Sequence, residues 1–252
     1  IYIQRTYNET RGFRRVTLYE IKVFTNDREI NTIARRFAEF QTLKKKIAGN
    51  SSALPSFPAS RGIFGFFSRS SPQVIAQRQF QLEEWLQKAC THTNIRRSGP
   101  IRDFLFDWDA VERVVGKEAA DQMKQGEGFT GKLDLSSKSI TDEGCRTIAP
   151  ALRTMPNLKW LNLGNNNIGD EGLAVLSNVV DAIPMLEYLH LFGNKIGNVG
   201  CQCLLELIEN DSLQSLTHLI LSDNPNISSE ELKTKFKRVW REKGKIPYNL
   251  YF

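Results

Sequence analysis

A leucine and asparagine pattern recurs four times in the second half of the chain. The segments LDLSSKSI, LNLGNNNI, LHLFGNKI and LILSDNPNI begin at residues 133, 161, 189 and 219, so successive first leucines are 28, 28 and 30 residues apart. Helix-like stretches such as DEGCRTIAPAL and DEGLAVLSNVV separate them. A period of this length indicates stacked units that bury a shared core, each with one short parallel strand and one helix.

This pattern is similar to that of the leucine-rich repeat family with long, ribonuclease-inhibitor-like repeats. The resemblance implies an α/β solenoid over residues 129–252, made of four repeats and a C-terminal cap that includes a helix near residues 229–242. Residues 113–128 are expected to form a linker or a capping helix. Asn166 and Asn194 are expected to be ladder residues whose amides bond the backbone of neighbouring turns.

Alternate strand positions carry the leucines, so the residues between them are predicted to face outward on the concave surface. Aromatic side chains on a rigid concave surface are typical of a protein-binding face. An alternative is that the first domain or the linker covers this surface. The predicted protein-partner residues are Trp160, Tyr188, His190, Phe192 and His218.

The sequence offers no candidate for catalysis. It has no Gly-rich phosphate loop, no triad pattern and no metal-ligand spacing, so we expect no enzyme activity, no metal and no cofactor. The four cysteines are interpreted as buried free thiols in a reducing compartment. Cys145 and Cys201 share one repeat position with Leu173, which predicts that both lie in the core.

Charge is distributed unevenly along the 252 residues. Residues 1–110 hold 18 Lys and Arg against 10 Asp and Glu, and the remainder holds 16 against 18. The basic half is the candidate for an anionic partner, either a membrane surface or a nucleic acid. No apolar run approaches the ~20 residues that cross a bilayer. The chain begins with Ile inside a strand-like run, which suggests a fragment of a longer protein.

The basic half opens with three strand-like runs at about residues 1–7, 16–24 and 29–35, followed by helix-like runs at 37–48, 72–90 and 101–111. This order predicts a small antiparallel sheet with helices. Arg35 and Arg36 lie where the third strand meets the first helix. Backbone N–H groups at a helix start favour an anion, and the arginine fork suits phosphate. The alternative is a basic pair on a solvated strand end.

Two further features of this half point to an anionic surface. The loop at 51–72 contains IFGFF at residues 63–67, flanked by Arg61 and Arg69, and exposed apolar residues in a loop usually mark an interface. One or two of these rings could instead pack on the core. Arg78 falls on the apolar stripe of the next helix, where burial costs desolvation unless a carboxylate or a ligand phosphate meets it.

RRFAEF at residues 35–40, the proline-containing loop, the apolar loop and the QRQFQLEEWL helix together resemble the phox-homology (PX) family of phosphoinositide-binding domains. The resemblance covers about residues 1–112 and implies an α+β domain with a three-stranded antiparallel sheet and a helical subdomain. It implies membrane insertion by Ile63, Phe64, Phe66 and Phe67. It assigns Arg36 to the inositol 3-phosphate, Phe37 to ring stacking and Arg78 to the ring hydroxyls. Arg61 replaces the lysine that the family places after the proline motif, and Arg35 completes the basic set.

We therefore expect a non-enzymatic, monomeric adaptor that is cytoplasmic and peripheral on endosomal membranes. Its PX domain would bind phosphatidylinositol 3-phosphate, and its repeats would bind an unidentified protein. The missing lysine motivates one alternative, a protein scaffold whose first domain does not bind lipid. Nucleic-acid binding by the basic half is a weaker alternative, and no nucleic-acid partner is expected.

Overall fold

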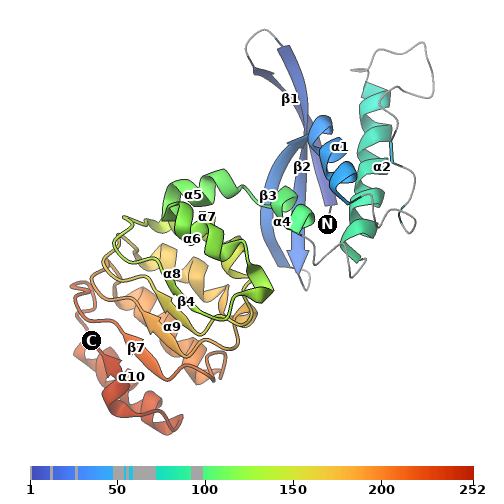
Figure 1. The fold of residues 1–252 in the computed structure, drawn as a ribbon. Helices are drawn as coiled ribbons and strands as arrows, with labels where there is room; N and C mark the ends of the chain where they lie inside the picture. Colours follow the sequence, from blue (N-terminus) through green and yellow to red (C-terminus); the bar gives the residue numbers. More distant parts are fainter. Residues whose placement is uncertain are drawn as a thin grey trace. The chain divides into compact units, whose positions relative to one another are not determined.

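The chain forms two compact units, Ile1–Asp107 and Trp108–Phe252, in a computed structural model (Figure 1). The structure describes residues 2–11, 14–25, 28–47, 54, 57–58, 72–91 and 99–252. Among these residues no helix combines the length and the apolar character needed to cross a membrane.

A three-stranded antiparallel sheet begins the first unit. It has the order β1 (Tyr2–Arg11), β2 (Arg14–Thr25) and β3 (Arg28–Arg36). Tyr19, Ile21 and Val23 alternate along β2 and are buried, as expected for a strand with one face on a core. In the register of the sheet, Tyr19 lies opposite Arg35 and Leu18 opposite Arg36. The sequence therefore predicted the three strands and their antiparallel arrangement correctly.

Among the described residues, three helices accompany this sheet: α1 (Phe37–Lys46), α2 (Pro72–Thr91) and α4 (Gly99–Leu105) (Figure 1). Phe40 of α1 is fully buried, with its ring centroid 5.8 Å from that of Tyr19 and 4.7 Å from that of Phe104. The edge-on geometry of both pairs is the arrangement that aromatic rings prefer. This cluster joins the sheet to α1 and α4 and forms the centre of the core.

The helix that the sequence places at residues 101–111 is two helices. Helix α4 ends at Leu105 and α5 begins at Trp108 and runs to Val115. Helix α5 packs against α6 (Lys117–Met123) and α7 (Asp142–Leu152), and it belongs to the second unit. A continuous apolar pattern cannot reveal this break, because buried side chains of both units supply it: Phe104 and Leu105 for the first, Trp108 and Val111 for the second.

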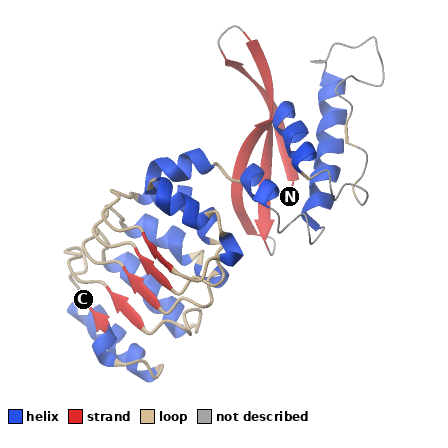
Figure 2. Cartoon of the chain, in the orientation of Figure 1, coloured by secondary structure: helices blue, strands red, loops and turns tan. Residues whose placement is uncertain are grey.

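Five short parallel strands form the sheet of the second unit, in the order β4 (Lys132–Asp134), β5 (Trp160–Asn162), β6 (Tyr188–His190), β7 (His218–Ile220) and β8 (Leu250–Tyr251). Leu133, Leu161, Leu189, Leu219 and Leu250 lie side by side across it and are buried. Helices α7, α8 (Asp170–Ser177) and α9 (Asn198–Glu209) cover one face of the sheet (Figure 2). The expected strand-and-helix repeat is confirmed, and α10 (Glu230–Glu242) follows the strand of the fourth repeat.

Buried asparagines bridge successive repeats. The amide of Asn194 donates to the carbonyl oxygens of Leu163 (2.9 Å), Leu191 (3.0 Å) and Phe192 (3.2 Å), and its Oδ1 accepts from the Ile168 N–H at 3.0 Å. Asn166 makes the equivalent bonds, as predicted. Asn224 makes them in the fourth repeat. The sequence prediction did not include Asn224, although it lies five residues after the first leucine of its repeat, as Asn166 and Asn194 do.

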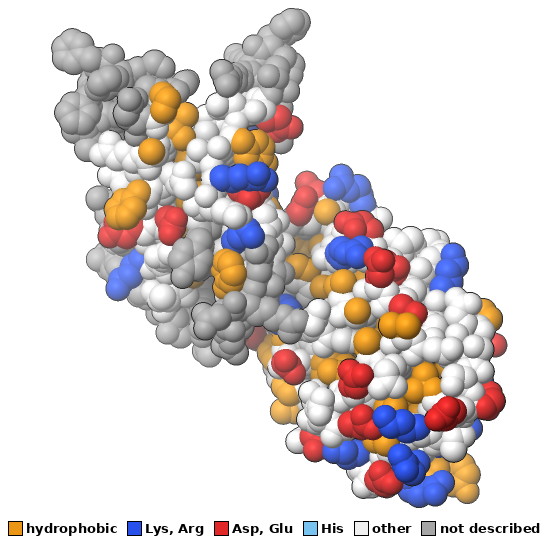
Figure 3. Space-filling model, turned by 180° about the vertical axis from the view of Figure 1, so that it is seen from behind, with side chains coloured by type: hydrophobic (Ala, Val, Ile, Leu, Met, Phe, Trp, Pro, Cys, Tyr) orange, Lys and Arg blue, Asp and Glu red, His pale blue; other side chains and the backbone are white. Residues whose placement is uncertain are grey.

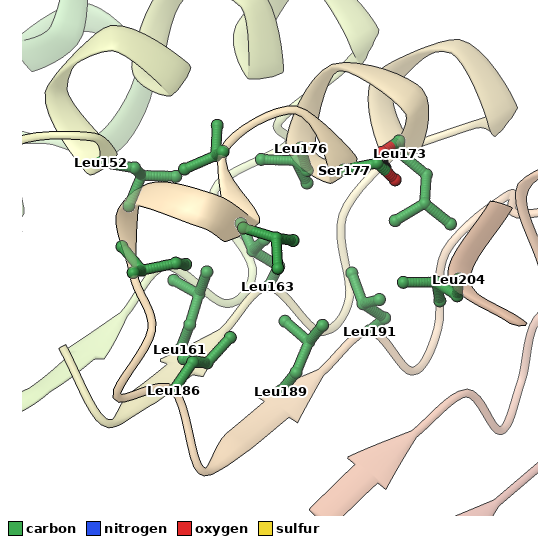
Figure 4. A pocket seen from close by; sticks show the side chains of 13 residues that line it. Leu152, Leu161, Leu163, Leu173, Leu176, Ser177, Leu186, Leu189, Leu191 and Leu204 are labelled. Carbon is green, nitrogen blue, oxygen red and sulfur yellow. Dashed lines mark hydrogen bonds between the residues drawn. The ribbon is translucent and has the colours of Figure 1, made fainter. Parts of the chain in front are cut away.

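Leucine and valine side chains enclose a cavity of about 20 Å³ inside the second unit (Figure 4). Ser177 also lines it, but its hydroxyl donates to the Leu173 carbonyl oxygen at 2.9 Å. A space this small holds about one water molecule. It is a packing defect of the core and offers no ligand site.

All four cysteines are free thiols. Cys145 and Cys201 are buried in the core, as their repeat position predicts, and burial raises the pKa of each thiol to about 12. The prediction that all four are buried is wrong for Cys90 and Cys203, which are half-buried.

Candidate functional site

Arg36 ends β3 and occupies the N-cap position of α1, with φ −83° and ψ 155°. Its backbone N–H donates to Oε2 of Glu39 at 2.7 Å, and its Nε lies 3.5 Å from the same oxygen. Its side chain remains 46% exposed. The guanidinium therefore reaches solvent beside a positive helix start, but it shares the position with one carboxylate of its own chain.

Arg35 has a different role from its neighbour. Its Nε donates to the Phe104 carbonyl oxygen and its Nη2 to the Phe106 carbonyl oxygen, both at 2.8 Å, and its side chain is only 16% exposed. Its Nε also lies 3.9 Å from Oε1 of Glu39, the carboxylate whose other oxygen lies 3.5 Å from the Arg36 Nε. Arg35 therefore ties β3 to the end of α4, and its contact with a ligand stays a prediction.

Phe37 and Arg78 lie together. Phe37 begins α1, and the guanidinium carbon of Arg78, from α2, lies 4.4 Å from the centroid of its ring. Arg78 is half-buried, three residues after Ile75 and four before the buried Leu82, as the sequence predicted. No carboxylate pairs with Arg78 among the described residues. The carboxylate alternative is therefore not realised in that part of the chain.

A second cation lies on the same aromatic group. Lys44 of α1 places its Nζ 5.1 Å from the ring centroid of Phe57, whose ring lies 5.8 Å from Phe37 and 5.0 Å from the buried Trp85. The sequence prediction missed Lys44. The available signal was composition, because residues 40–82 contain six Lys and Arg and no Asp or Glu. A stretch without acidic residues cannot neutralise its own cations.

The remaining predicted residues of the basic half lie outside the described residues. These are Arg61 and the predicted membrane-insertion residues Ile63, Phe64, Phe66 and Phe67. Their assignment therefore rests on the sequence alone.

In the second unit, the parallel register brings the predicted outward residues together. Lys132, Trp160, Tyr188 and His218 share one row across the sheet, and Asp134, Asn162, His190 and Ile220 share the other. The Tyr188 and His218 rings stack with centroids 4.3 Å apart, and Trp160 meets His190 edge-on at 5.1 Å. Phe192 lies 6.4 Å from His190. The five predicted residues therefore form one aromatic strip.

Lys132 extends this strip, with its Nζ 5.6 Å from the Trp160 ring centroid. Burial, together with the neighbouring His218, lowers the pKa of His190. His190 is therefore neutral near pH 7 and contributes to the strip as an aromatic ring. The His218 Nδ1 lies 2.9 Å from the Thr217 hydroxyl. Among the described residues no three His, Cys, Asp or Glu side chains group together to hold a metal ion.

Comparisons with known proteins agree with this division of the chain. A family model for the PX domain matches residues 23–107, and a model for the Leucine Rich repeat matches residues 154–177 and 182–205. No curated protein sequence matches at a significant level.

Several solved structures resemble parts of the chain. A designed CISK-PX domain is 25% identical, covers 41% of this chain and 95% of its own, and has a TM-score of 0.36. The mouse SNX19 PX domain with bound sulphate ion is 23% identical, covers 40% and 87%, and has a TM-score of 0.27. Leiomodin-1 actin-binding site 2 is 16% identical, covers 54% and 80%, and has a TM-score of 0.46.

Proposed function

Since this chain carries a PX domain followed by leucine-rich repeats, we propose that it is a peripheral membrane adaptor whose PX domain binds phosphatidylinositol 3-phosphate on endosomal membranes. The repeats, proposed to form a solenoid over residues 129–252, present their aromatic strip to a protein partner. The proposal includes a monomeric, cytoplasmic protein without enzyme activity. The boundary expected at residue 112 falls inside α5, which belongs to the second unit, so the proposed end of the PX domain is Asp107. Residues 113–128 are proposed to act as a linker or capping helix.

The environment of Arg78 is the main observation that supports lipid binding by the PX domain. It is half-buried on an aromatic ring and has no carboxylate partner among the described residues. Partial burial of an unneutralised cation costs free energy, and a phosphate or a polyol that accepts its N–H groups offsets that cost. Lys44 adds positive charge on helix α1, and the exposed Arg36 adds positive charge at its N-cap.

Membrane attachment is proposed to combine these basic residues with the apolar loop at residues 63–67. Each basic residue near an anionic surface contributes on the order of 1 kcal/mol. Inserted side chains contribute roughly 25 cal/mol per Å² of apolar area. Neither contribution alone gives stable attachment, whereas the two together can.

Liposome sedimentation with Arg36→Ala tests the proposed site. We expect wild-type protein to bind vesicles that contain phosphatidylinositol 3-phosphate, and the variant to bind at least about tenfold more weakly, a loss of about 1.4 kcal/mol. Lys88→Ala is the matched control, because it removes one exposed positive charge from α2 and should leave binding within about twofold. Equal binding by Arg36→Ala and wild type would reject the site. A wild-type protein that binds no phosphoinositide vesicle would favour the scaffold alternative.

A further inference from the structure

A surface groove of about 610 Å³ lies between α9 and α10. Val199, Cys203 and Glu206 line it from α9, and Glu231 and Leu232 line it from α10. The three α9 residues are four and then three positions apart, so they share one side of that helix. Helices form this α9–α10 groove, whereas the aromatic strip lies along the strands, so the two are separate surfaces of the second unit.

The groove coincides with a break in the repeat. Helices α7, α8, α9 and α10 begin at residues 142, 170, 198 and 230, so the steps between them are 28, 28 and 32 residues. Asn198 fixes the start of α10, because its Oδ1 accepts the N–H groups of Ser228 at 3.0 Å and Ser229 at 3.1 Å. The last helix of the stack is therefore tied to α9 at its start but follows a longer connection than the others (Figure 1).

Val199 differs from the residues at the same place in the preceding repeats. Glu143 and Glu171 precede it by 56 and 28 residues. Between α7 and α8 these two carboxylates share Arg146, at 3.2 Å and 2.9 Å. In α9 the same position carries an apolar side chain that is 67% exposed. A single exposed apolar residue is ordinary, but Val199 lines one groove together with the half-buried Leu232, and apolar groups gathered in one place mark an interface.

Two carboxylates give the groove its charge. Glu206 and Glu231 are exposed, and neither forms an ion pair among the residues that the structure describes. Glu206 accepts one hydrogen bond, from Nε2 of Gln202 at 3.1 Å. Lys235 also lines the groove, but it already pairs with Glu209 at 3.1 Å. The groove therefore combines apolar side chains with uncompensated negative charge, and a complementary partner brings apolar side chains and cations.

We propose that the α9–α10 groove is a second docking surface, which binds an amphipathic basic helix of a partner protein. The apolar face of that helix covers Val199, Cys203 and Leu232, and its Lys or Arg side chains pair with Glu206 and Glu231. This inference goes beyond the proposed function, which assigns protein binding to the aromatic strip alone. Two separate surfaces allow one repeat domain to hold two partners at once.

Cys203 reports directly whether the groove is occupied. It is a half-buried thiol in the lining, whereas Cys145 and Cys201 are buried. Wild-type protein is alkylated with N-ethylmaleimide, and mass spectrometry of its peptides gives a rate for each cysteine, with Cys90 of the first unit as the internal reference. We expect a helical peptide of Leu and Lys, added at several times its Kd, to slow alkylation of Cys203 about fivefold and to leave Cys90 unchanged. The same peptide with Glu in place of Lys should give no protection.

Matched pairs of variants show whether the peptide recognises the groove or only the charge of the unit. Glu206→Gln combined with Glu231→Gln should weaken the peptide about three- to tenfold. Glu143→Gln combined with Glu171→Gln removes the same charge from α7 and α8 and should change its affinity by less than about twofold. Burial, and after it Glu206, raises the pKa of the Cys203 thiol, so each variant is compared with its own rate without peptide.

The apolar contact is tested by Val199→Ser, which should weaken the peptide several-fold. Met185→Ser, at an apolar position that is 51% exposed outside the groove, should leave the affinity unchanged. Three results would each overturn the proposal. These are failure of the Leu and Lys peptide to protect Cys203, equal losses in the two double variants, and a Cys203 that is protected without peptide and becomes reactive on dilution. The last result would show that a second copy of the chain fills the groove.

Discussion

Glu39 competes directly with any ligand for Arg36. As the third residue of α1, it accepts the backbone N–H of Arg36 at 2.7 Å and places the same oxygen 3.5 Å from the guanidinium. The first contact stabilises the helix start in the manner of a capping box, and the second partly neutralises the cation. A single carboxylate thus serves the fold and opposes anion binding.

Glu39→Gln separates these two roles. Glutamine keeps an oxygen that can accept the Arg36 N–H but carries no charge. We expect binding to phosphatidylinositol 3-phosphate vesicles to strengthen several-fold, with a melting temperature close to that of wild type. Glu39→Ala is the control for the cap and should cost about 1 kcal/mol of helix stability. Unchanged vesicle binding by Glu39→Gln would show that the carboxylate does not compete.

At the scale of elements, the repeats are joined by more than their strands. The first residues of successive helices clamp the next repeat. Asp142 accepts the Gly169 N–H at 2.7 Å, and Asp170 accepts the Gly197 N–H at 2.6 Å and the Gly200 N–H at 2.9 Å. Together with the asparagine ladder, these bonds satisfy backbone N–H and C=O groups that the short strands do not pair.

Asn194→Ala should destabilise the second unit strongly. It leaves the buried Ile168 N–H without its acceptor. It also removes one donor each from the Leu163 and Leu191 carbonyl oxygens, which still accept from Asn166 and Asn224. We expect a loss of about 1–3 kcal/mol in the free energy of unfolding, measured by urea denaturation. Asn167→Ala, at an exposed position, should change it by less than about 0.5 kcal/mol. Similar losses for the two variants would contradict the ladder as a source of stability.

The loop at residues 63–67 is an element whose role is predicted from the sequence. Phe66→Glu combined with Phe67→Glu replaces two apolar side chains with charges that oppose insertion into a bilayer. We expect sedimentation with vesicles to fall steeply and binding of the soluble head group to stay unchanged. Loss of both activities would indicate that the loop supports the fold.

At the scale of the whole molecule, the two units differ in charge. Residues 1–107 hold 18 Lys and Arg against 9 Asp and Glu, whereas residues 108–252 hold 16 against 19. On the face shown in Figure 3, acidic and basic side chains are interspersed over the second unit. An anionic membrane therefore attracts the first unit and not the second.

Vesicle binding should accordingly depend on ionic strength. Raising salt from about 0.1 M to about 1 M shortens the Debye length from roughly 10 Å to 3 Å, which screens exposed cations such as Arg36. We expect affinity for phosphoinositide vesicles to fall at least about tenfold in sedimentation assays. Some affinity should remain at high salt. If this remainder disappears in the Phe66→Glu, Phe67→Glu variant, it measures the contribution of the apolar loop to membrane binding. Salt-independent binding would contradict the electrostatic half of the proposal.

The sequence by itself determined the strands of both sheets, the repeats and most of the helices in their order. Strand alternation, the helical spacing of apolar residues and the repeat of 28 to 30 residues predicted the antiparallel sheet, the parallel sheet, the placement of Arg78 on the apolar stripe of its helix and the outward aromatic residues. Tertiary structure alone decided how neighbouring cations are used. The carbonyl oxygens that bind Arg35 lie 69 and 71 residues away, and the phenylalanine ring that meets Arg78 lies on another helix. Two adjacent arginines look alike in a sequence, and only contacts between distant segments determine which one supports the fold and which one reaches solvent.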